Sequence, residues 1–200
     1  VLGTPDFIYQ GNMVSMERPW RRITFANALM EIGDVPGHVL EDEKAFRAWL
    51  QERDVAATDL SLGYMWEAAL SRFVQPLLLA PTFITHFPQD VSPFAKATTD
   101  DDGLVERFEI YWGGLEAGNG YSELNDPREQ RSRMEAMARG GTKELSEQRV
   151  DEDYILALEH GMPPAAGFGV GIDRLMMLLT DSASIRDVIL FPLLKPKEVD

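Results

Sequence analysis

Cysteine is absent from the 200-residue sequence. A disulfide framework, a zinc–thiolate site and a catalytic thiol are therefore excluded, and the absence fits a reducing compartment. Histidine is scarce, and His38, His86 and His160 show neither metal-ligand spacing nor a neighbouring serine nucleophile motif, so we interpret all three as structural. The sequence contains no Walker A loop and no H-E-x-x-H motif.

Long hydrophobic runs are also missing. No apolar stretch approaches the roughly 18 residues of a membrane span, and the first residues lack the basic-then-apolar pattern of a signal peptide. We therefore expect a cytoplasmic protein with no membrane partner. Because the chain begins with Val1 rather than Met, a further hypothesis is that it is an excised segment or a cleavage product of a longer protein.

Basic residues are few. The 19 Lys and Arg stand against 33 Asp and Glu, and the resulting net charge of −14 repels nucleic-acid phosphates unless basic groups gather locally. Free-standing nucleic-acid binding is therefore disfavoured. With 44% hydrophobic and 26% charged residues and no internal repeat, the chain has the composition of a single soluble domain over residues 1–200.

Hydrophobic periodicity and turn residues divide the chain into short helices and strands. We predict a hairpin over residues 7–14, helices over 24–33, 42–53, 61–76, 126–141, 151–159 and 172–179, and strands over 82–86, 105–112, 115–124, 166–171 and 188–191. Strands gathered in the middle of the chain, with helices flanking them, favour an α+β fold with a largely antiparallel sheet.

Gly113 and Gly114 separate two of these strands and indicate a hairpin turn. With strict alternation, Glu109 then faces Gly118, and Glu109 and Glu116 lie diagonally on one face with Cβ atoms about 7–8 Å apart. Two carboxylates at that distance repel by about 2 kcal/mol at an effective dielectric constant of about 20, and a divalent cation between them reverses the sign. Oxygen ligands favour Mg²⁺, Ca²⁺ or Mn²⁺, and Mg²⁺ usually shares such a pair with substrate phosphates. The competing interpretation is a solvent-facing strand whose glutamates contact nothing.

The second strand continues with polar and aromatic residues. Asn119, Tyr121 and Glu123 alternate and share a face, where a carbonyl, an aromatic wall and a carboxylate suit a ligand that ends in an ammonium group. Strict alternation puts this set on the face opposite to the glutamate pair. Because a single site needs both sets, we predict a β-bulge at Gly118, between Glu116 and Asn119, where one inserted residue reverses the facing of everything beyond it.

Near the C-terminus, the segment GFGVGID carries glycine at residues 167, 169 and 171. The spacing is not G-x-G-x-x-G, because Ile172 occupies the sixth place, so a Rossmann site is disfavoured. Glycine at alternate strand positions lets a flat ring or a neighbouring backbone approach one face closely. Arg174, in the first helical turn that follows, can reach a phosphate beside the helix N–H groups. The alternative is a glycine-rich bend with Arg174 paired to an acid.

Two long stretches together resemble a known family. FEIYWGGLEAGNGYSELNDP and GMPPAAGFGVGIDRLMMLLTDSASIRDVILFP closely resemble the C-terminal half of class II lysyl-tRNA synthetases, and the similarity extends to the YQG and PWRRIT pieces near residues 9–24. The second stretch looks like class II motif 3. The resemblance implies part of the class II catalytic-domain fold, with lysine, ATP, Mg²⁺ and tRNA as ligands and a homodimer as the family's usual assembly.

The resemblance also implies a role for each motif residue. The acids that hold Mg²⁺ against ATP match Glu109 and Glu116, the lysine pocket matches Asn119, Tyr121 and Glu123, and the ATP-binding part of motif 3 matches Gly171, Asp173 and Arg174. Arg174 is the expected catalytic residue, because it neutralises charge that develops on the phosphates. The implied reaction is attack of the lysine carboxylate on the ATP α-phosphate, followed by transfer of the lysyl group to the terminal ribose of tRNA.

Three functional hypotheses stay open. Class II motifs 1 and 2 and the anticodon-binding domain are not visible in the sequence, so we expect roughly half of an active site. The first hypothesis is part of a lysine–tRNA ligase. The second is the related ligase that attaches β-lysine to an elongation factor, which Gly118 in EAGNG argues against because that enzyme has alanine there. The third is a catalytically silent fragment that acts as a binding module.

Overall fold

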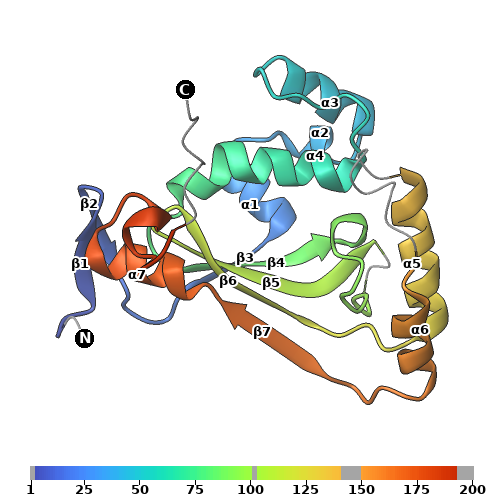
Figure 1. Ribbon diagram of the computed structural model, residues 1–200. Helices are drawn as coiled ribbons and strands as arrows, with labels where there is room; N and C mark the ends of the chain where they lie inside the picture. The colour runs from blue at the N-terminus through green and yellow to red at the C-terminus, as the bar shows by residue number, and fades with distance from the viewer. Residues whose placement is uncertain (1–2, 101–102, 141–149, 193–200) are drawn as a thin grey trace, which may run out of the picture.

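A five-stranded sheet forms the centre of the computed structural model, which describes residues 3–100, 103–140 and 150–192 (Figure 1). The strand order is β3 (Arg21–Thr24), β4 (Thr82–Pro88), β5 (Leu104–Trp112), β6 (Leu115–Ser122) and β7 (Ala166–Val170). β3 and β4 are parallel, whereas the other neighbouring strands are antiparallel. The prediction of an α+β fold with a largely antiparallel sheet is therefore confirmed. A separate hairpin of β1 (Asp6–Tyr9) and β2 (Asn12–Ser15) precedes the sheet, as the sequence predicts.

Helices lie along one side of the sheet and beside both of its ends (Figure 1). The α-helices are α1 (Phe25–Glu31), α2 (Gly37–Leu40), α3 (Glu43–Gln51), α4 (Leu62–Ala69), α5 (Pro127–Gly140), α6 (Glu152–Glu159) and α7 (Ile172–Thr180). Several begin at a residue that caps the free N–H groups: Thr24 accepts from Asn27 at α1, and Asp151 accepts from Tyr154 at α6. The described residues also form the π-helical turn η1 (Leu70–Val74) and the 3₁₀ turns η2 (Gln75–Leu77), η3 (Gln89–Val91) and η4 (Ile185–Asp187).

The strand predicted over residues 188–191 is wrong. Those residues follow η4, and the backbone N–H groups of Val188 and Ile189 both donate to the carbonyl oxygen of Ile185. Because the turn uses these donors, they are not free for a strand ladder. Leu190 and Phe191 are 89% and 91% exposed, so the apolar character that suggested a buried strand reflects surface residues here.

The main hydrophobic core lies between the sheet and helices α1 to α4. Its fully buried members include Phe25, Leu29, Phe46, Met65 and Ile84. Phe25 meets the β4 residue Phe87 edge to face, with ring centroids 4.8 Å apart. Because each buried side chain of this size contributes about 1.5–3 kcal/mol, this cluster fixes the four helices against β4 and β5.

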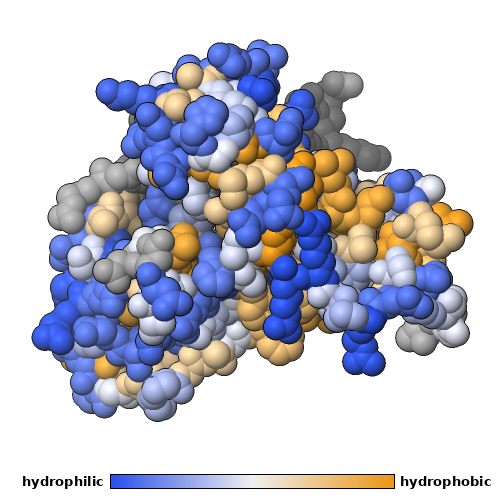
Figure 2. Space-filling model, turned by 180° about the vertical axis from the view of Figure 1, so that it is seen from behind, coloured by the Kyte–Doolittle hydropathy of each residue, from blue (hydrophilic) through white to orange (hydrophobic). Residues whose placement is uncertain are grey.

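A smaller cluster lies at the other end of the sheet. Tyr9, Val14, Trp112, Ala117 and Leu178 are its buried members, so it joins the β1–β2 hairpin and α7 to the tip of the β5–β6 hairpin. From behind, apolar side chains gather on the half of the molecule that carries these elements, and the rest of that view is mostly hydrophilic (Figure 2). No helix among the described residues is long and apolar enough to cross a membrane.

The β5–β6 register contains the predicted irregularity. Trp112 pairs with Leu115 and Tyr111 with Glu116, but Ile110 then pairs with Gly118, which leaves Ala117 as the extra residue. The bulge therefore lies in the predicted interval, although its inserted residue is Ala117 and not Gly118.

Close packing explains why Gly118 stays within the ladder. A Cβ atom at Gly118 would lie 2.6 Å from the carbonyl oxygen of Gly169 in β7, so a residue with a side chain does not fit there. Ala117 instead places its methyl group in the small cluster, where it is 5% exposed. One consequence corrects the predicted pairing, because Glu109 faces Asn119 and not Gly118.

Candidate active site

One face of the β5–β6 hairpin carries the polar residues that the sequence singled out. Alternation and the shifted register place on it Arg107, Glu109, Tyr111, Glu116, Asn119 and Tyr121. Glu123 joins them, because a Cβ atom at Gly167, the β7 partner of Tyr121, would lie 3.7 Å from the Glu123 Oε1 atom. The prediction that the glutamate pair and the Asn119 set converge on one face is therefore confirmed.

A cavity of about 410 Å³ lies between this face and the helices. Its sheet wall includes Arg107, Glu109, Tyr111, Glu116 and Asn119, and its helical wall is formed by Glu67, Leu70, Ser71 and Gln75. Carboxylates, amides, hydroxyls and a guanidinium therefore face one another across a space of small-molecule size.

Glu109 is 5% exposed and has a donor on each carboxylate oxygen. Arg107 donates from Nη2 to Oε1 at 2.5 Å, and the Tyr111 hydroxyl donates to Oε2 at 2.5 Å. Burial raises the pKa of the Glu109 carboxyl, and the guanidinium and the hydroxyl act against that shift. Arg107 is held in turn by the Val91 carbonyl at 3.1 Å and the Ser92 hydroxyl at 2.7 Å.

Glu116 is tied to the junction between β7 and α7. Arg174 donates from Nη1 to the Glu116 carbonyl oxygen at 2.7 Å and to its Oε2 atom at 3.1 Å. The backbone N–H of Gly171, the N-cap of α7, donates to the Ala117 carbonyl at 2.9 Å. The bulge thus anchors the predicted motif 3 segment, and Arg174 is paired to an acid, as the alternative interpretation expected. Asp173 lies exposed in the first turn of α7 and does not line the cavity.

The residues predicted to bind lysine are Asn119 and Tyr121 on β6 and Glu123 immediately after it. Asn119 donates weakly to Glu116 Oε1 at 3.4 Å, so its amide is in contact with one acid of the glutamate pair. Burial, and then the Glu123 charge, raise the pKa of Tyr121. Tyr154 on α6 belongs to the same surroundings, because burial and then the charges of Glu123 and Tyr121 raise its pKa.

Sequence reasoning missed several residues around this site, Arg107, Tyr111, Glu67 and Tyr154 among them. Arg107 and Tyr111 flank Glu109 at two residues' distance on the same strand, so strand alternation was a sufficient signal to find them. Glu67 and Tyr154 come from helices that are distant in sequence, and no local pattern marks them.

The donor set fits a hard cation such as Mg²⁺. Glu109 and Glu116 offer carboxylate oxygens and Asn119 an amide oxygen, which are the ligand types that Mg²⁺ prefers. Within the described ranges, no group of three or more His, Cys, Asp or Glu side chains lies at metal-binding distance. Two direct acids leave most of the coordination shell to phosphates and water, which is the expected use of this pair.

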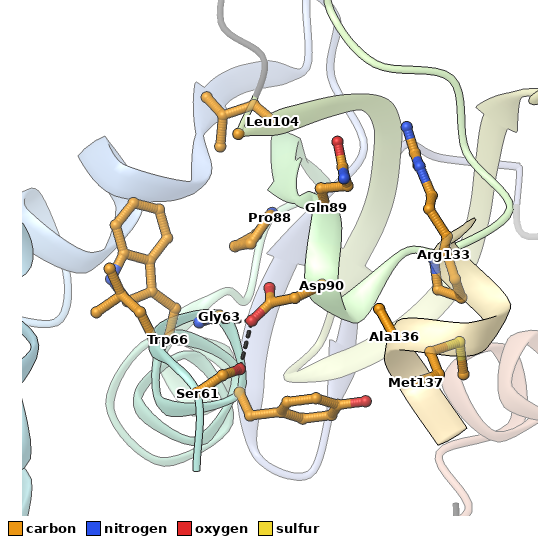
Figure 3. A pocket seen from close by; sticks show the side chains of 14 residues that line it. Ser61, Gly63, Trp66, Pro88, Gln89, Asp90, Leu104, Arg133, Ala136 and Met137 are labelled. Atoms are coloured by element: carbon orange, nitrogen blue, oxygen red, sulfur yellow. Dashed lines mark hydrogen bonds between the residues drawn. The ribbon is translucent and has the colours of Figure 1, made fainter. Parts of the chain in front are cut away.

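A larger hollow of about 550 Å³ lies beyond the N-terminal end of α4 (Figure 3). Its lining is mainly apolar and includes Trp66, Pro88, Leu104 and Met137, and it contains none of the predicted site residues. Its acid, Asp90, accepts from the Ser61 hydroxyl and from the Gly63 backbone N–H at 3.2 Å, so it serves as the cap of α4. Of the residues predicted from the sequence, Glu109, Glu116 and Asn119 line the smaller, polar cavity instead.

Known proteins resemble this chain over almost its whole length. Residues 4–195 match the family described as tRNA synthetases class II (D, K and N). The chain belongs to this family. A lysine–tRNA ligase of Thermosynechococcus vestitus is 44% identical over 200 residues, which cover 98% of this chain and 40% of that protein. The lysine–tRNA ligases of Wolinella succinogenes and Nostoc punctiforme are also 44% identical, over 100% and 98% of this chain and 40% and 36% of their own lengths.

The chain therefore spans about two fifths of the length of these relatives. Membership of the class II family accounts for the largely antiparallel sheet. The fold class and the family resemblance that the sequence predicted are both confirmed.

Proposed function

We propose that the protein activates lysine with ATP and transfers it to tRNA, and that this chain carries the metal-binding, lysine-binding and motif 3 parts of the site. The observation that carries the proposal is the convergence of Glu109, Glu116 and Asn119 on one cavity wall, which the bulge at Ala117 produces. The similarity to lysine–tRNA ligases supports lysine as the amino acid.

Each of the five predicted residues on this face has a task in this reaction. Glu109 and Glu116 would hold Mg²⁺, which when bound neutralises and orients the phosphates of ATP. Glu123 pairs with the ε-ammonium group of lysine, and Tyr121 forms the wall beside its alkyl chain. The Asn119 amide lies between the two sets and holds the lysine carboxylate toward the nucleotide.

Arg174 and the α7 N-terminus serve the nucleotide. Gly171, Asp173 and Arg174 form the start of α7, where free N–H groups and the guanidinium favour phosphate. As a carboxylate oxygen of lysine bonds to the α-phosphorus, the bond to pyrophosphate breaks and Arg174 stabilises the charge on the phosphates. A ribose hydroxyl of tRNA then attacks the lysyl carbonyl, and AMP leaves. The lysine carboxylate oxygen and the α-phosphorus must approach to about 3–3.5 Å, which requires the lysine-binding and ATP-binding residues to lie on a single face.

Calorimetric titration with lysine tests the amino-acid assignment. Removal of the Glu123 charge in Glu123→Gln leaves the ε-ammonium group unpaired, so we expect lysine affinity to fall at least about tenfold while ATP affinity stays unchanged. Glu159→Gln, an exposed position at the end of α6, is the matched control and should bind as the wild type does. Equal lysine affinity in Glu123→Gln and the wild type would contradict the assignment.

The acceptor is tested separately. Lysine-dependent exchange of labelled pyrophosphate into ATP, followed by charging of tRNA, is the result expected of a lysine–tRNA ligase. Preference for β-lysine with transfer to a protein would instead support the elongation-factor ligase. Binding of lysine and ATP without any exchange would support the silent binding fragment.

A further inference from the structure

The helical wall of the cavity is aligned by an unusual turn. α4 passes directly into the π-helical turn η1, in which the Gln75 N–H donates to the Leu70 carbonyl, five residues back. On a continuous α-helix, residue 75 would be rotated by about 80° from residue 67, because eight residues exceed two turns by that angle. The wider π turn removes part of this rotation, so Glu67, Ser71 and Gln75 all line the cavity.

Glu67 is the charged member of this wall. It is half-buried, and burial raises the pKa of its carboxyl to about 7, with Arg107 acting against the shift and the charges of Glu109, Asp90 and Glu116 adding to it. The ion pairs and hydrogen bonds found within the described ranges do not include its carboxylate. A partly buried acid that faces other acids without a partner costs stability, which is typical of a functional position.

The side chains around Glu67 form their hydrogen bonds with other groups. The Arg107 guanidinium donates to Glu109, Val91 and Ser92. Asp90 caps α4 through Ser61 and Gly63, and Gln75 donates from Nε2 to the Gly114 carbonyl at 3.0 Å. Within the described ranges, Glu67 is therefore free to interact with a ligand that enters the cavity. A cation bound there would relieve the repulsion between the Glu67 carboxylate and the carboxylates of Glu109 and Glu116.

Glu67 does not approach closely enough to be a third direct ligand, since the described residues contain no three-acid group at metal-binding distance. Mg²⁺, however, keeps several of its water molecules when two carboxylates and phosphates bind it. We propose that Glu67 is a positioning residue of the magnesium–nucleotide site, accepting hydrogen bonds from water molecules on the cation that Glu109 and Glu116 hold. The inference rests on the proposed function.

The Mg²⁺ requirement of nucleotide binding tests this assignment. ATP is titrated calorimetrically at a series of Mg²⁺ concentrations and once in the presence of a chelator, for the wild type, for Glu67→Gln and for Glu41→Gln. Glu41 lies exposed at the end of α2, away from the cavity, and is the matched control. Groups that act on a metal through its bound water typically change its affinity by 10–100-fold, so we expect Glu67→Gln to need about ten times more Mg²⁺. Its ATP affinity in the chelator should be unchanged.

The outcomes separate this inference from the proposed function. An unchanged Mg²⁺ requirement in folded Glu67→Gln would overturn the role of Glu67 alone, and so would a loss of lysine affinity without a change in that requirement. Absence of Mg²⁺-dependent ATP binding in the wild type would overturn the proposed function and this inference together. Thermal unfolding of each variant shows whether it is folded, and Glu67→Asp, which keeps the charge, should restore part of the Mg²⁺ affinity.

Discussion

Glu109 and Asn119 face each other directly across the β5–β6 hairpin. In a regular hairpin with the same turn, the partner of Glu109 would be Gly118, and Asn119 would point to the opposite face. The single extra residue Ala117 therefore brings a buried acid and an amide to one cavity. Several expected results depend on this relationship.

The first concerns the packing at the bulge. Gly118→Ala adds a methyl group 2.6 Å from the Gly169 carbonyl, where only backbone movement can relieve the contact, so we expect a loss of about 1–3 kcal/mol in the free energy of unfolding. Gly169→Ala is the matched control, because a Cβ atom there meets nothing within 4 Å. Urea unfolding measures both variants. Equal midpoints would show that β7 does not lie as close to β6 as described.

The second prediction concerns the Tyr111 hydroxyl, which donates a hydrogen bond to Glu109. Tyr111→Phe removes one of the two donors of a carboxylate that is 5% exposed, so we expect destabilisation by about 1–3 kcal/mol. Tyr9→Phe removes a hydroxyl whose contact with the Ser182 carbonyl is 3.5 Å long, and it should cost clearly less. Chemical denaturation of the two variants decides the matter. A larger loss of stability in Tyr9→Phe than in Tyr111→Phe would contradict the expected importance of the hydrogen bond from Tyr111 to Glu109.

The third concerns Arg174. Its Nη1 atom donates to both the backbone and the side chain of Glu116. The planar guanidinium can also bond a phosphate through two N–H groups at once, which an ammonium group does not reproduce. We expect Arg174→Lys to weaken ATP binding by about tenfold although the charge is kept. Arg128→Lys, with a side chain 91% exposed, is the control for calorimetry. The assignment fails if ATP binds both variants with wild-type affinity.

The fourth prediction concerns whether Mg²⁺ binds before or together with ATP. Arg107 and Arg174 already compensate Glu109 and Glu116, so Mg²⁺ alone must compete with two guanidinium groups. We expect measurable Mg²⁺ binding only when nucleotide phosphates supply further ligands. Titration of Mg²⁺ with and without ATP checks this expectation, and tight binding of the metal without nucleotide would contradict it.

The fifth concerns pH. The pKa of Glu67 is raised to about 7, so the folded state binds a proton more readily than the unfolded state does, and this contribution to stability is lost as pH rises from about 4.5 through 7. After allowance for solvent screening, the loss amounts to about 1–2 kcal/mol. Glu67→Gln should remove this part of the pH dependence of urea unfolding. A pH profile that is identical in the two proteins would contradict the shift.

Local sequence signals were sufficient for much of the fold. Gly113 and Gly114 set the turn, and the pair Trp112 and Leu115 beside it has the predicted register. Even the bulge followed from the chemical need to bring two sets of side chains together. Its exact residue did not, because Gly118 is required by the approach of β7, a contact between segments about 50 residues apart.

The candidate site shows the same division. The alternating residues of β6 share a face as predicted, since alternation is a property of the strand itself. That Arg174 rests on Glu116, and that Glu67 faces both glutamates, depends on how α7 and α4 pack on the sheet. The strand predicted at residues 188–191 was wrong for a related reason. Apolar residues favour a strand only where a neighbouring strand can pair with them, and the sequence alone does not show whether one is present.

The unequal size of the two hydrophobic clusters gives the two ends of the site different resistance to local opening. Among the described residues, the cluster that holds α7 has five buried members, whereas the helix that carries Glu67 packs on the much larger core. Opening free energies follow buried apolar contact, so amide hydrogens of α7 should exchange with deuterium sooner than those of α4. The nucleotide end, where Arg174 must leave Glu116 to reach a phosphate, is thus the end whose rearrangement disturbs the rest of the protein least.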